Sequence, residues 1–457
     1  MAKLLWERGP FTGAFPWLRH SFIAQDFIDH HLVLHLLQSP FTAILPLVEA
    51  AKYSAAVFAT LALFSFYLLL RKLEIHCPEA FLILLLASSH PFLYRMCMPR
   101  AQSLGVILFS VFLWAWFKGP RYSVFLLALV FSWSYQICFL LIPMVGLLMI
   151  PEVIEGRLRD SWKWLESIGG ITLGQFANLY FPHNLRFLYL HVGIVSLNEA
   201  NLRVGSEWKP YNSWFLLESS WPSFFAIFLV LTLFLLHRKA QFSKRSKGAF
   251  LLIFLFFVLM MKNRRWMEYW PLFSSFFTAS ALDDYWRIYP IKGSKRRIVL
   301  SGLFILPALL MLVHQGNETA KTMEKCSHWT RYRGAALWLK ENSTSNSLVY
   351  TTDWDDFPEL FFHNHENHYI VGLDPHFLYL HDADLYRLWE RINKGLIFDP
   401  SLFIERSFGA ELVFSDHRHR RFLKKARRDE GFIEAYRDDD CSVFQRVKER
   451  KSIDKAP

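Results

Sequence analysis

Apolar residues form long unbroken runs over the first two thirds of this chain and short alternating runs over its last third. A helix needs about 20 mostly apolar residues to cross the hydrocarbon core of a bilayer. The long runs approach that length and contain few charges, so each predicts a membrane-spanning helix. About ten such runs lie at roughly 53–71, 79–95, 101–117, 121–136, 138–152, 165–182, 221–237, 248–262, 268–284 and 298–314, and the pair 121–136 and 138–152 could instead form one helix.

Basic residues in the connecting loops predict how the bundle is oriented, because Lys and Arg favour the cytoplasmic side of short loops. They occur in every second loop. This alternation places residues 1–50, the loop 183–220 and everything after 315 outside the cytoplasm of a plasma (inner) membrane. The cytoplasmic groups are Arg71 and Lys72; Lys118 and Arg121; Arg157, Arg159 and Lys163; Arg238, Lys239, Lys244, Arg245 and Lys247; and Lys292, Lys295, Arg296 and Arg297.

Residues 316–457 have a different pattern, with dense charge and alternating helix and strand signals. Such alternation is typical of a small α/β domain, here with a three- or four-stranded sheet. The fold class is therefore a multi-pass α-helical membrane bundle over 51–315, preceded by an external loop with an amphipathic helix over 1–50 and followed by a soluble external α/β domain. The elements predicted in that domain are helices at Trp329–Glu341, Ala383–Asn393 and His417–Arg428, and strands at Ser347–Thr352, His368–Leu373, Ala410–Phe414 and Ser442–Val447.

Composition supports the membrane interpretation and argues against nucleic-acid binding. The chain has 457 residues, 53% of them hydrophobic and only 20% charged, with a mean hydropathy of +0.18. The net charge of +11 comes from basic residues that mostly sit in short loops beside apolar runs, where they set orientation. The five cysteines have no paired spacing, so they predict neither a disulfide framework nor a zinc site.

Two basic groups break the loop pattern, since they lie at the predicted external ends of spans. They are Arg95 with Arg100, and Arg264 with Arg265, the latter followed by Glu268 and Tyr269. Arginine forks match phosphate oxygens, so clustered arginines at a membrane face predict a site for an anionic lipid head group. The alternatives are contact with the outer head groups of the bilayer or pairing with Glu268.

Four local stretches lie in the predicted external regions and combine charged, polar and aromatic residues. The first is acidic and rich in histidine, the second is the turn with Arg95 and Arg100, the third is polar and aromatic, and the fourth pairs a helix end with an Asp-rich turn after a strand. They are Phe27–His35; Arg95–Arg100; Asn178–Asn184 together with Glu207–Tyr211; and Trp338–Ser343 followed by Ser347–Phe357.

With these stretches, the layout resembles the lipid-carrier-dependent glycosyltransferases of the GT-C class, and among them the catalytic subunit of oligosaccharyltransferase. The layout covers nearly the whole chain. That subunit has Trp-Trp-Asp-Tyr-Gly after its strand, and here only Trp354 and Asp355 match, with Asp353, Asp356 and Phe357 at the other positions. The resemblance therefore does not extend to recognition of the acceptor sequon.

The resemblance implies transfer of a sugar from a polyprenyl-phosphate or polyprenyl-diphosphate carrier to a glycan, lipid or protein acceptor at the outer face of the membrane. It implies a general base or a cation ligand in the first external loop, and a divalent cation such as Mg²⁺ or Mn²⁺. The residues it assigns are Asp29 and Asp26 for catalysis; Arg95, Arg100, Arg264, Arg265 and Tyr269 for the carrier phosphate; Glu207, Trp208, Trp354 and Asp355 for the acceptor side; and Asp29, His31 and Glu207 for the metal.

Alternatives remain at several of these positions. The spacing of Asp29, His31 and His35 could also hold a transition metal, or Asp29 could simply cap a helix that carries interfacial histidines. Family members have a span and an Asp-containing motif before the first external loop, and this chain begins inside that loop. We therefore expect either a truncated start or a copy that lacks one catalytic carboxylate. The rival function is a non-catalytic membrane protein that binds or transports lipid-linked saccharide.

Overall fold

The structure, a computed structural model, describes residues 1–9, 14–156, 162–190, 202, 205–237, 239–290 and 294–447. The chain divides into two compact units, and each is assembled from three separate segments. Unit 1 comprises Met1–Pro10, Asp29–Leu185 and Gly205–Cys326, and unit 2 comprises Phe11–Ile28, Arg186–Val204 and Ser327–Pro457.

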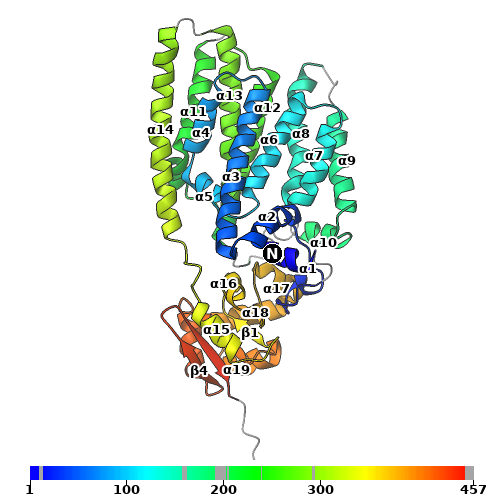
Figure 1. The fold of residues 1–457 in the computed structure, drawn as a ribbon, viewed down its shortest axis with the longest axis vertical. Helices are drawn as coiled ribbons and strands as arrows, with labels where there is room; N and C mark the ends of the chain where they lie inside the picture. The colour runs from blue at the N-terminus through cyan, green and yellow to red at the C-terminus, as the bar shows by residue number, and fades with distance from the viewer. Residues whose placement is uncertain are drawn as a thin grey trace, which may run out of the picture. The chain divides into compact units, whose positions relative to one another are not determined.

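Unit 1 is a helical bundle whose long helices run side by side, as Figure 1 shows for α3, α6, α11, α12 and α13. Short 3₁₀ helices connect several of them. Its elements are α1 (Ala2–Arg8), α2 (Leu32–Ile44), α3 (Leu47–Lys72), α4 (Pro78–Ala87), α5 (His90–Met96), α6 (Gln102–Lys118), α7 (Ser123–Ser134), η2 (Gln136–Leu140), α8 (Leu141–Ile154), α9 (Trp162–Phe176), η4 (Ser206–Trp208), α11 (Ser213–Leu236), α12 (Lys244–Lys262), η5 (Arg264–Glu268), α13 (Trp270–Ile288) and α14 (Ser294–Glu324), and α10 (His183–Leu190) crosses the boundary between the units.

Local capping chemistry explains where several of these helices begin. The Asn212 side chain accepts a hydrogen bond from the backbone of Trp214 at the start of α11, and Ser243 does the same for Ser246 at the start of α12. α13 begins with Pro271 in its first turn, where a missing N–H costs nothing. The helix starts are therefore encoded locally.

Helix packing in unit 1 depends on aromatic rings and on glycine. Phe109 of α6 packs edge-on against Phe131, Phe256, Tyr269 and Phe273 from three other elements, with ring centroids 5.1–5.7 Å apart. Helices α7 and α9 approach so closely that a Cβ on Gly170 or Gly174 would collide with α7. The absence of a side chain at these two positions therefore permits the close packing of α7 and α9.

The prediction of about ten membrane spans is not confirmed. Each predicted apolar run coincides with a helix, but within the described residues only three helices are long and apolar enough to cross a membrane by length and composition: Leu47–Lys72, Gln136–Ile154 and Ser213–Leu236. Several other runs are interrupted. The run 79–95 breaks into α4 and α5 at Ser88 and Ser89, and the run 121–152 breaks at Tyr135, so it is not one long helix.

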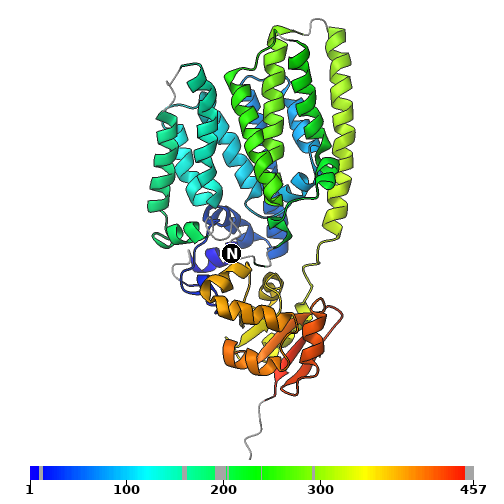
Figure 2. The ribbon, with the colours of Figure 1, turned by 180° about the vertical axis from the view of Figure 1, so that it is seen from behind.

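Unit 2 contains a five-stranded mixed sheet with strand order β2-β1-β3-β5-β4, flanked by helices (Figure 2). β1, β2 and β3 are parallel, and β5 runs antiparallel to β3 and β4. The elements are η1 (Phe22–Ala24), α15 (Arg333–Glu341), β1 (Leu348–Thr351), α16 (Phe357–His363), β2 (His368–Tyr369), α17 (Pro375–His381), α18 (Ala383–Asn393), α19 (Pro400–Phe403), the π-helical η6 (Ile404–Phe408), β3 (Leu412–Asp416), α20 (Arg420–Ala426), β4 (Phe432–Arg437) and β5 (Cys441–Arg446).

The prediction of a small α/β domain is confirmed. The predicted number of strands, three or four, is wrong, because the sheet has five strands and β4 was not predicted from the sequence. That strand has mixed burial and follows a polar segment, so its apolar alternation is weak. β1 and β3 are instead buried along their whole length, because helices cover both faces of a parallel sheet. The predicted basic helix is also shorter than expected, since it begins only at Arg420.

Part of the N-terminal segment extends the sheet of unit 2. The backbone of Leu18 forms an isolated parallel bridge with Tyr369 of β2, supported by a 2.7 Å hydrogen bond from the Tyr369 N–H to the Trp17 carbonyl. The Trp17 indole also donates to the His365 carbonyl at 2.8 Å. This long-range pairing covers the β2 edge and places residues 14–28 with the C-terminal segment.

Candidate functional site

Three arginines of unit 1 surround one carboxylate. Arg95 Nη1 lies 2.8 Å and Arg100 Nη1 lies 3.1 Å from Glu207 Oε1, while Arg265 Nε lies 3.9 Å from Glu207 Oε2. These side chains come from α5, from the turn before α6, from η5 and from η4. The sequence separations exceed one hundred residues for the contacts of Glu207 with Arg95 and Arg100, so only the fold assembles the group.

A second carboxylate anchors this arginine cluster from below the surface. Glu268 has 1% side-chain exposure and lies 3.3 Å from Arg95 Nη1, and Gln102 donates a 3.2 Å hydrogen bond to the same Glu268 oxygen. Arg95 is itself only 7% exposed, whereas Arg100 is 57% and Arg265 31% exposed. Arg95 is therefore held rigidly between two carboxylates, and the other two arginines reach solvent.

The neighbouring predicted residues support this cluster. The Arg265 guanidinium lies 4.7 Å from the centre of the Trp208 ring, and Arg264 lies 5.0 Å from that of Tyr211. Arg264 also donates to the Pro210 carbonyl at 3.3 Å, so it fixes the 207–211 loop and does not contact Glu207 in the structure. Tyr269, predicted to bind phosphate, is 1% exposed and packs against Phe109.

The electrostatics of the arginine cluster favour an anion. Burial raises the pKa of Glu207, but Arg95, Arg100 and Arg265 lower it more, so its pKa lies below the usual value and the group is ionised at neutral pH. Three guanidinium groups against Glu207 and Glu268 leave a net positive charge. An oxygen anion that reached this position would find the same donors that Glu207 now uses.

The predicted catalytic pair, Asp29 and Asp26, is divided between the two units. Asp29 belongs to unit 1, is 5% exposed, and accepts hydrogen bonds from the His31 backbone at 3.0 Å and from His35 Nδ1 at 2.7 Å. Burial raises the pKa of Asp29, but the hydrogen bond and charge of His35 and the neighbouring His30 lower it further, below the usual value. Asp26 belongs to unit 2 and pairs with Arg186 at 2.8 Å.

Unit 2 contains a cluster of opposite character, which we call the aspartate cluster. It lies where β1 and β3 end side by side, at the carboxyl edge of the parallel strands, where open α/β sheets bind ligands. Arg418 approaches Asp356, Asp355 and Asp353 through Nη2 at 3.3, 3.6 and 3.9 Å, and its Nε contacts Asp416.

Like charges determine the protonation of the aspartate cluster. Burial and the neighbouring Asp355 raise the pKa of Asp353 to about 6, and burial with the charges of Asp416, Asp353 and Asp355 raises that of Asp356 well above its usual value. Burial also raises the pKa of Asp416, but hydrogen bonds from His419 and Arg418 lower it overall. Trp354, predicted on the acceptor side, lies partly buried against the core beside this cluster.

Three solved structures share this fold. The archaeal oligosaccharyltransferase AglB from Archaeoglobus fulgidus in complex with an inhibitory peptide and a dolichol-phosphate matches over 94% of this chain, with a TM-score of 0.64 and 13% identity. The apo form of the Archaeoglobus fulgidus enzyme matches over 91% with a TM-score of 0.63 and 13% identity, and its form tethered to an acceptor peptide with the NVT sequon matches over 98% with a TM-score of 0.62 and 13% identity.

The likeness concerns the fold, which is that of an oligosaccharyltransferase. This chain spans 66%, 64% and 69% of the lengths of those three structures. No protein-family model and no curated protein sequence matches it. The resemblance inferred from the four sequence stretches thus agrees with the observed fold at this general level.

The predicted divalent cation has no cluster of ligands in the described part of the chain. No group of three or more His, Cys, Asp or Glu side chains is arranged there as a metal site. Of the three residues predicted to bind it, Asp29 pairs with His35, Glu207 pairs with arginines, and the His31 ring lies 5.0 Å from that of Tyr135. The cation stays a prediction.

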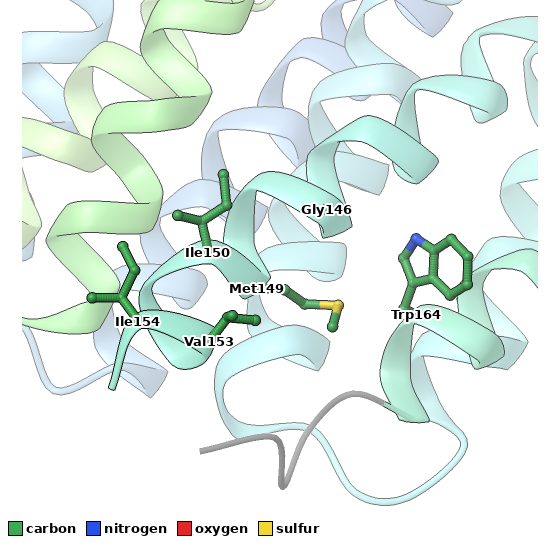
Figure 3. A pocket seen from close by; sticks show the side chains of 6 residues that line it. All are labelled: Gly146, Met149, Ile150, Val153, Ile154 and Trp164. Carbon is green, nitrogen blue, oxygen red and sulfur yellow. The ribbon is translucent and has the colours of Figure 1, made fainter. Parts of the chain in front are cut away.

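An apolar recess of about 440 Å³ opens between α8 and α9 of unit 1. Met149 points toward Trp164 across it in Figure 3. No charged side chain lines it, so it has no group for acid–base or phosphate chemistry, and its apolar lining suits a hydrocarbon chain. The lining residues are Gly146, Met149, Ile150, Val153, Ile154 and Trp164.

Sequence reasoning singled out both external arginine pairs but missed three partners. The basic run 417–428 looked like one helix face, whereas Arg418 and His419 precede α20 and join the aspartate cluster. Gln102, which contacts Glu268, carries no charge signal. A signal for the arginine cluster did exist, because Arg95, Arg100, Arg264 and Arg265 depart from the predicted loop pattern and such charges need a partner, which is Glu207 of the loop 183–220.

Proposed function

We propose that this chain is a membrane glycosyltransferase that moves a sugar from a polyprenyl-phosphate or polyprenyl-diphosphate carrier to an acceptor on the non-cytoplasmic side. The observation that carries the proposal is the arginine cluster, in which Arg95, Arg100 and Arg265 converge on Glu207. The oligosaccharyltransferase fold and the long apolar helices support it.

Transfer of a sugar from a phosphate carrier requires positive charge beside the phosphate, and the arginine cluster provides it. A carrier-linked sugar has a phosphate leaving group, so an enzyme accelerates transfer mainly by stabilising the charge that develops on that phosphate. Arg100 and Arg265 are partly exposed and can rearrange toward a phosphate, while the buried Arg95 keeps the site positive. The dolichol-phosphate in the similar archaeal structure supports a lipid-linked phosphate as the ligand class.

The acceptor is proposed to approach unit 2 at the aspartate cluster. Trp354 and Asp355 occupy the positions that match the acceptor motif, and Asp355 is 48% exposed. One of the similar archaeal structures holds a tethered acceptor peptide, which supports an acceptor substrate for a protein of this fold. The carboxylates of this cluster outnumber its cations, so a neutral or cationic acceptor fits better than an acidic one.

The test measures transfer of radiolabelled sugar from polyprenyl-phosphate donors by membranes that contain the full chain. Arg265→Ala removes one charged hydrogen-bond donor, so donor binding should weaken by about 1.5–3 kcal/mol, a factor of roughly 10 to 100. Arg71→Ala provides the matched control, because Arg71 is an exposed arginine at the end of α3 with no place in the cluster.

Sugar transfer and donor binding, measured on the same variants, distinguish an enzyme from a protein that only binds the donor. Transfer by the unmodified chain that falls in Arg265→Ala and not in Arg71→Ala supports the glycosyltransferase. Donor binding with the same pattern and no transfer to any acceptor would favour a protein that binds or carries lipid-linked saccharide. Equal donor binding in both variants would reject the arginine cluster as the phosphate site.

A further inference from the structure

Asp29 and His35 form a carboxylate–imidazole pair in which the carboxylate is enclosed. His35 Nδ1 lies 2.7 Å from Asp29 Oδ2, while the other oxygen, Oδ1, accepts the backbone N–H of His31 at 3.0 Å. The side chain of Asp29 is 3% exposed and that of His35 is 20% exposed. Both Asp29 oxygens are therefore occupied and turned away from solvent, whereas the imidazole reaches the surface of unit 1.

This geometry leaves one ring nitrogen of His35 available. With Nδ1 held by Asp29, the proton of a neutral imidazole resides on Nδ1, so Nε2 carries the free lone pair. Within the described part of the chain, no hydrogen bond to His35 Nε2 is present. A carboxylate in this position fixes the tautomer of the ring and stabilises the imidazolium that forms when Nε2 takes a proton.

A hydrogen bond links the helix that carries this pair to the turn that carries Arg100. Gln38 lies three residues after His35 on the same face of α2, and its side chain donates to the Pro99 carbonyl at 3.2 Å, directly before Arg100. The His31 ring, one turn before His35, packs 5.0 Å from that of Tyr135. All of these residues belong to unit 1, and the Gln38 contact ties helix α2, which carries His35, to the turn that carries Arg100.

We propose that His35 is the general base of the reaction and that Asp29 is its positioning residue. This inference rests on the proposed function and replaces direct proton abstraction by Asp29. The nucleophile it implies is an acceptor hydroxyl, because an imidazole relays a hydroxyl proton through one hydrogen bond.

The step balances without any further reactant. The acceptor oxygen bonds to the anomeric carbon of the donor as the bond from that carbon to the carrier phosphate oxygen breaks, and the phosphate leaves with the electron pair. The hydroxyl proton passes to His35 Nε2, which gives an imidazolium paired with Asp29. The arginine cluster holds the anionic carrier phosphate, and the imidazolium later returns its proton to solvent.

The experiment compares sugar transfer to a hydroxyl acceptor in His35→Ala, His35→Gln and Asp29→Asn. Loss of a general base typically costs about 10²–10⁴-fold, so we expect a fall in kcat of that size in both His35 variants with little change in the donor KM. Added imidazole should restore part of the activity of His35→Ala and none of that of Asp29→Asn. In His35→Gln the side chain can still donate a hydrogen bond to Asp29, so this variant separates loss of the base from loss of the folded structure.

His76→Ala is the matched control, because His76 pairs with Asp283 through the same ring nitrogen at 2.6 Å but lies beside Arg245 and Arg287, away from the arginine cluster. It should transfer sugar like the unmodified chain. Full kcat in His35→Gln, or loss of activity confined to Asp29→Asn, would overturn the proposal. No transfer by the unmodified chain from any donor would instead reject the proposed function, and the role of His35 with it.

Discussion

The two units carry charge clusters built from opposite residues. In unit 1, Arg95, Arg100 and Arg265 outnumber Glu207 and Glu268, and they depress the pKa of Glu207. In unit 2, the aspartates outnumber Arg418 and His419, and burial together with the charges of neighbouring aspartates raises the pKa values of Asp353 and Asp356. The same kinds of ion pair thus produce a cluster with excess positive charge in one unit and a cluster of aspartates with raised pKa values in the other.

The two clusters also differ in how strongly water screens their ion pairs. Arg95 and Glu268 are almost fully buried, so neither is screened by water. Arg418 is 53% exposed even though its partner Asp416 is fully buried, so solvent screens one side of the pairing. Three predictions test these differences, and their expected effects decrease in the order given.

Removal of Arg95 should have the largest effect on stability. Arg95→Met leaves the buried Glu268 and the half-buried Glu207 short of a counter-charge, and breaking a buried pair in this way costs about 3–5 kcal/mol. Thermal unfolding of the full chain in detergent measures the loss. Arg100→Met removes an exposed arginine from the same Glu207 oxygen and should cost below about 1 kcal/mol. Equal losses would show that burial does not distinguish the two arginines.

Removal of Arg418 should lower the stability of unit 2 by an intermediate amount. Arg418→Met leaves the aspartate cluster without its guanidinium, and with the discount for exposure we expect a loss of about 2 kcal/mol. The additional change Asp416→Asn removes the fully buried carboxylate and should recover part of that loss. Hydrogen exchange of β1 and β3 reports the effect locally. A double variant less stable than Arg418→Met would contradict repulsion as the cause.

Neutralisation of Asp353 should have the smallest effect on the free energy of unfolding, and it should raise this free energy where the two preceding substitutions lower it. Its pKa rises from 3.8 to about 6 on folding, so the folded state holds a proton between these pH values that the unfolded chain releases. Stability is therefore lost as the pH rises from about 4 to 6, and the whole shift corresponds to at most about 3 kcal/mol. Because the charge of Asp355 contributes to the shift and remains in the variant, we expect Asp353→Asn to recover about 1 kcal/mol at pH 7 and nothing at pH 3.5.

The measurement is thermal unfolding of both forms across that pH range. Asp439→Asn makes the same change of charge at an exposed aspartate of unit 2, and it controls for net charge. A stabilisation that is independent of pH, or one that Asp439→Asn reproduces, would argue against a raised pKa at Asp353.

The sequence alone determined the helical runs and the α/β character of the last third, and it singled out the two arginine pairs. Apolar runs and capping residues act over one or two helical turns, so the runs predicted at roughly 221–237 and 248–262 are helical and α11 and α12 begin directly after the capping residues Asn212 and Ser243. Arg95 and Arg265 could be singled out because each violates a rule that is read within a single loop. Signals of this kind need no knowledge of the fold.

Only the tertiary structure decided which charged side chains pair with one another. Glu207 meets Arg95 across 112 positions and Arg418 meets Asp356 across 62, and no local pattern encodes such distances. The proposed assignment of the general base to His35 instead of Asp29 likewise rests on burial, because both Asp29 oxygens accept hydrogen bonds and His35 is the more exposed partner. Helix formation is local, whereas charge pairing and burial depend on residues that the chain brings together only when it folds.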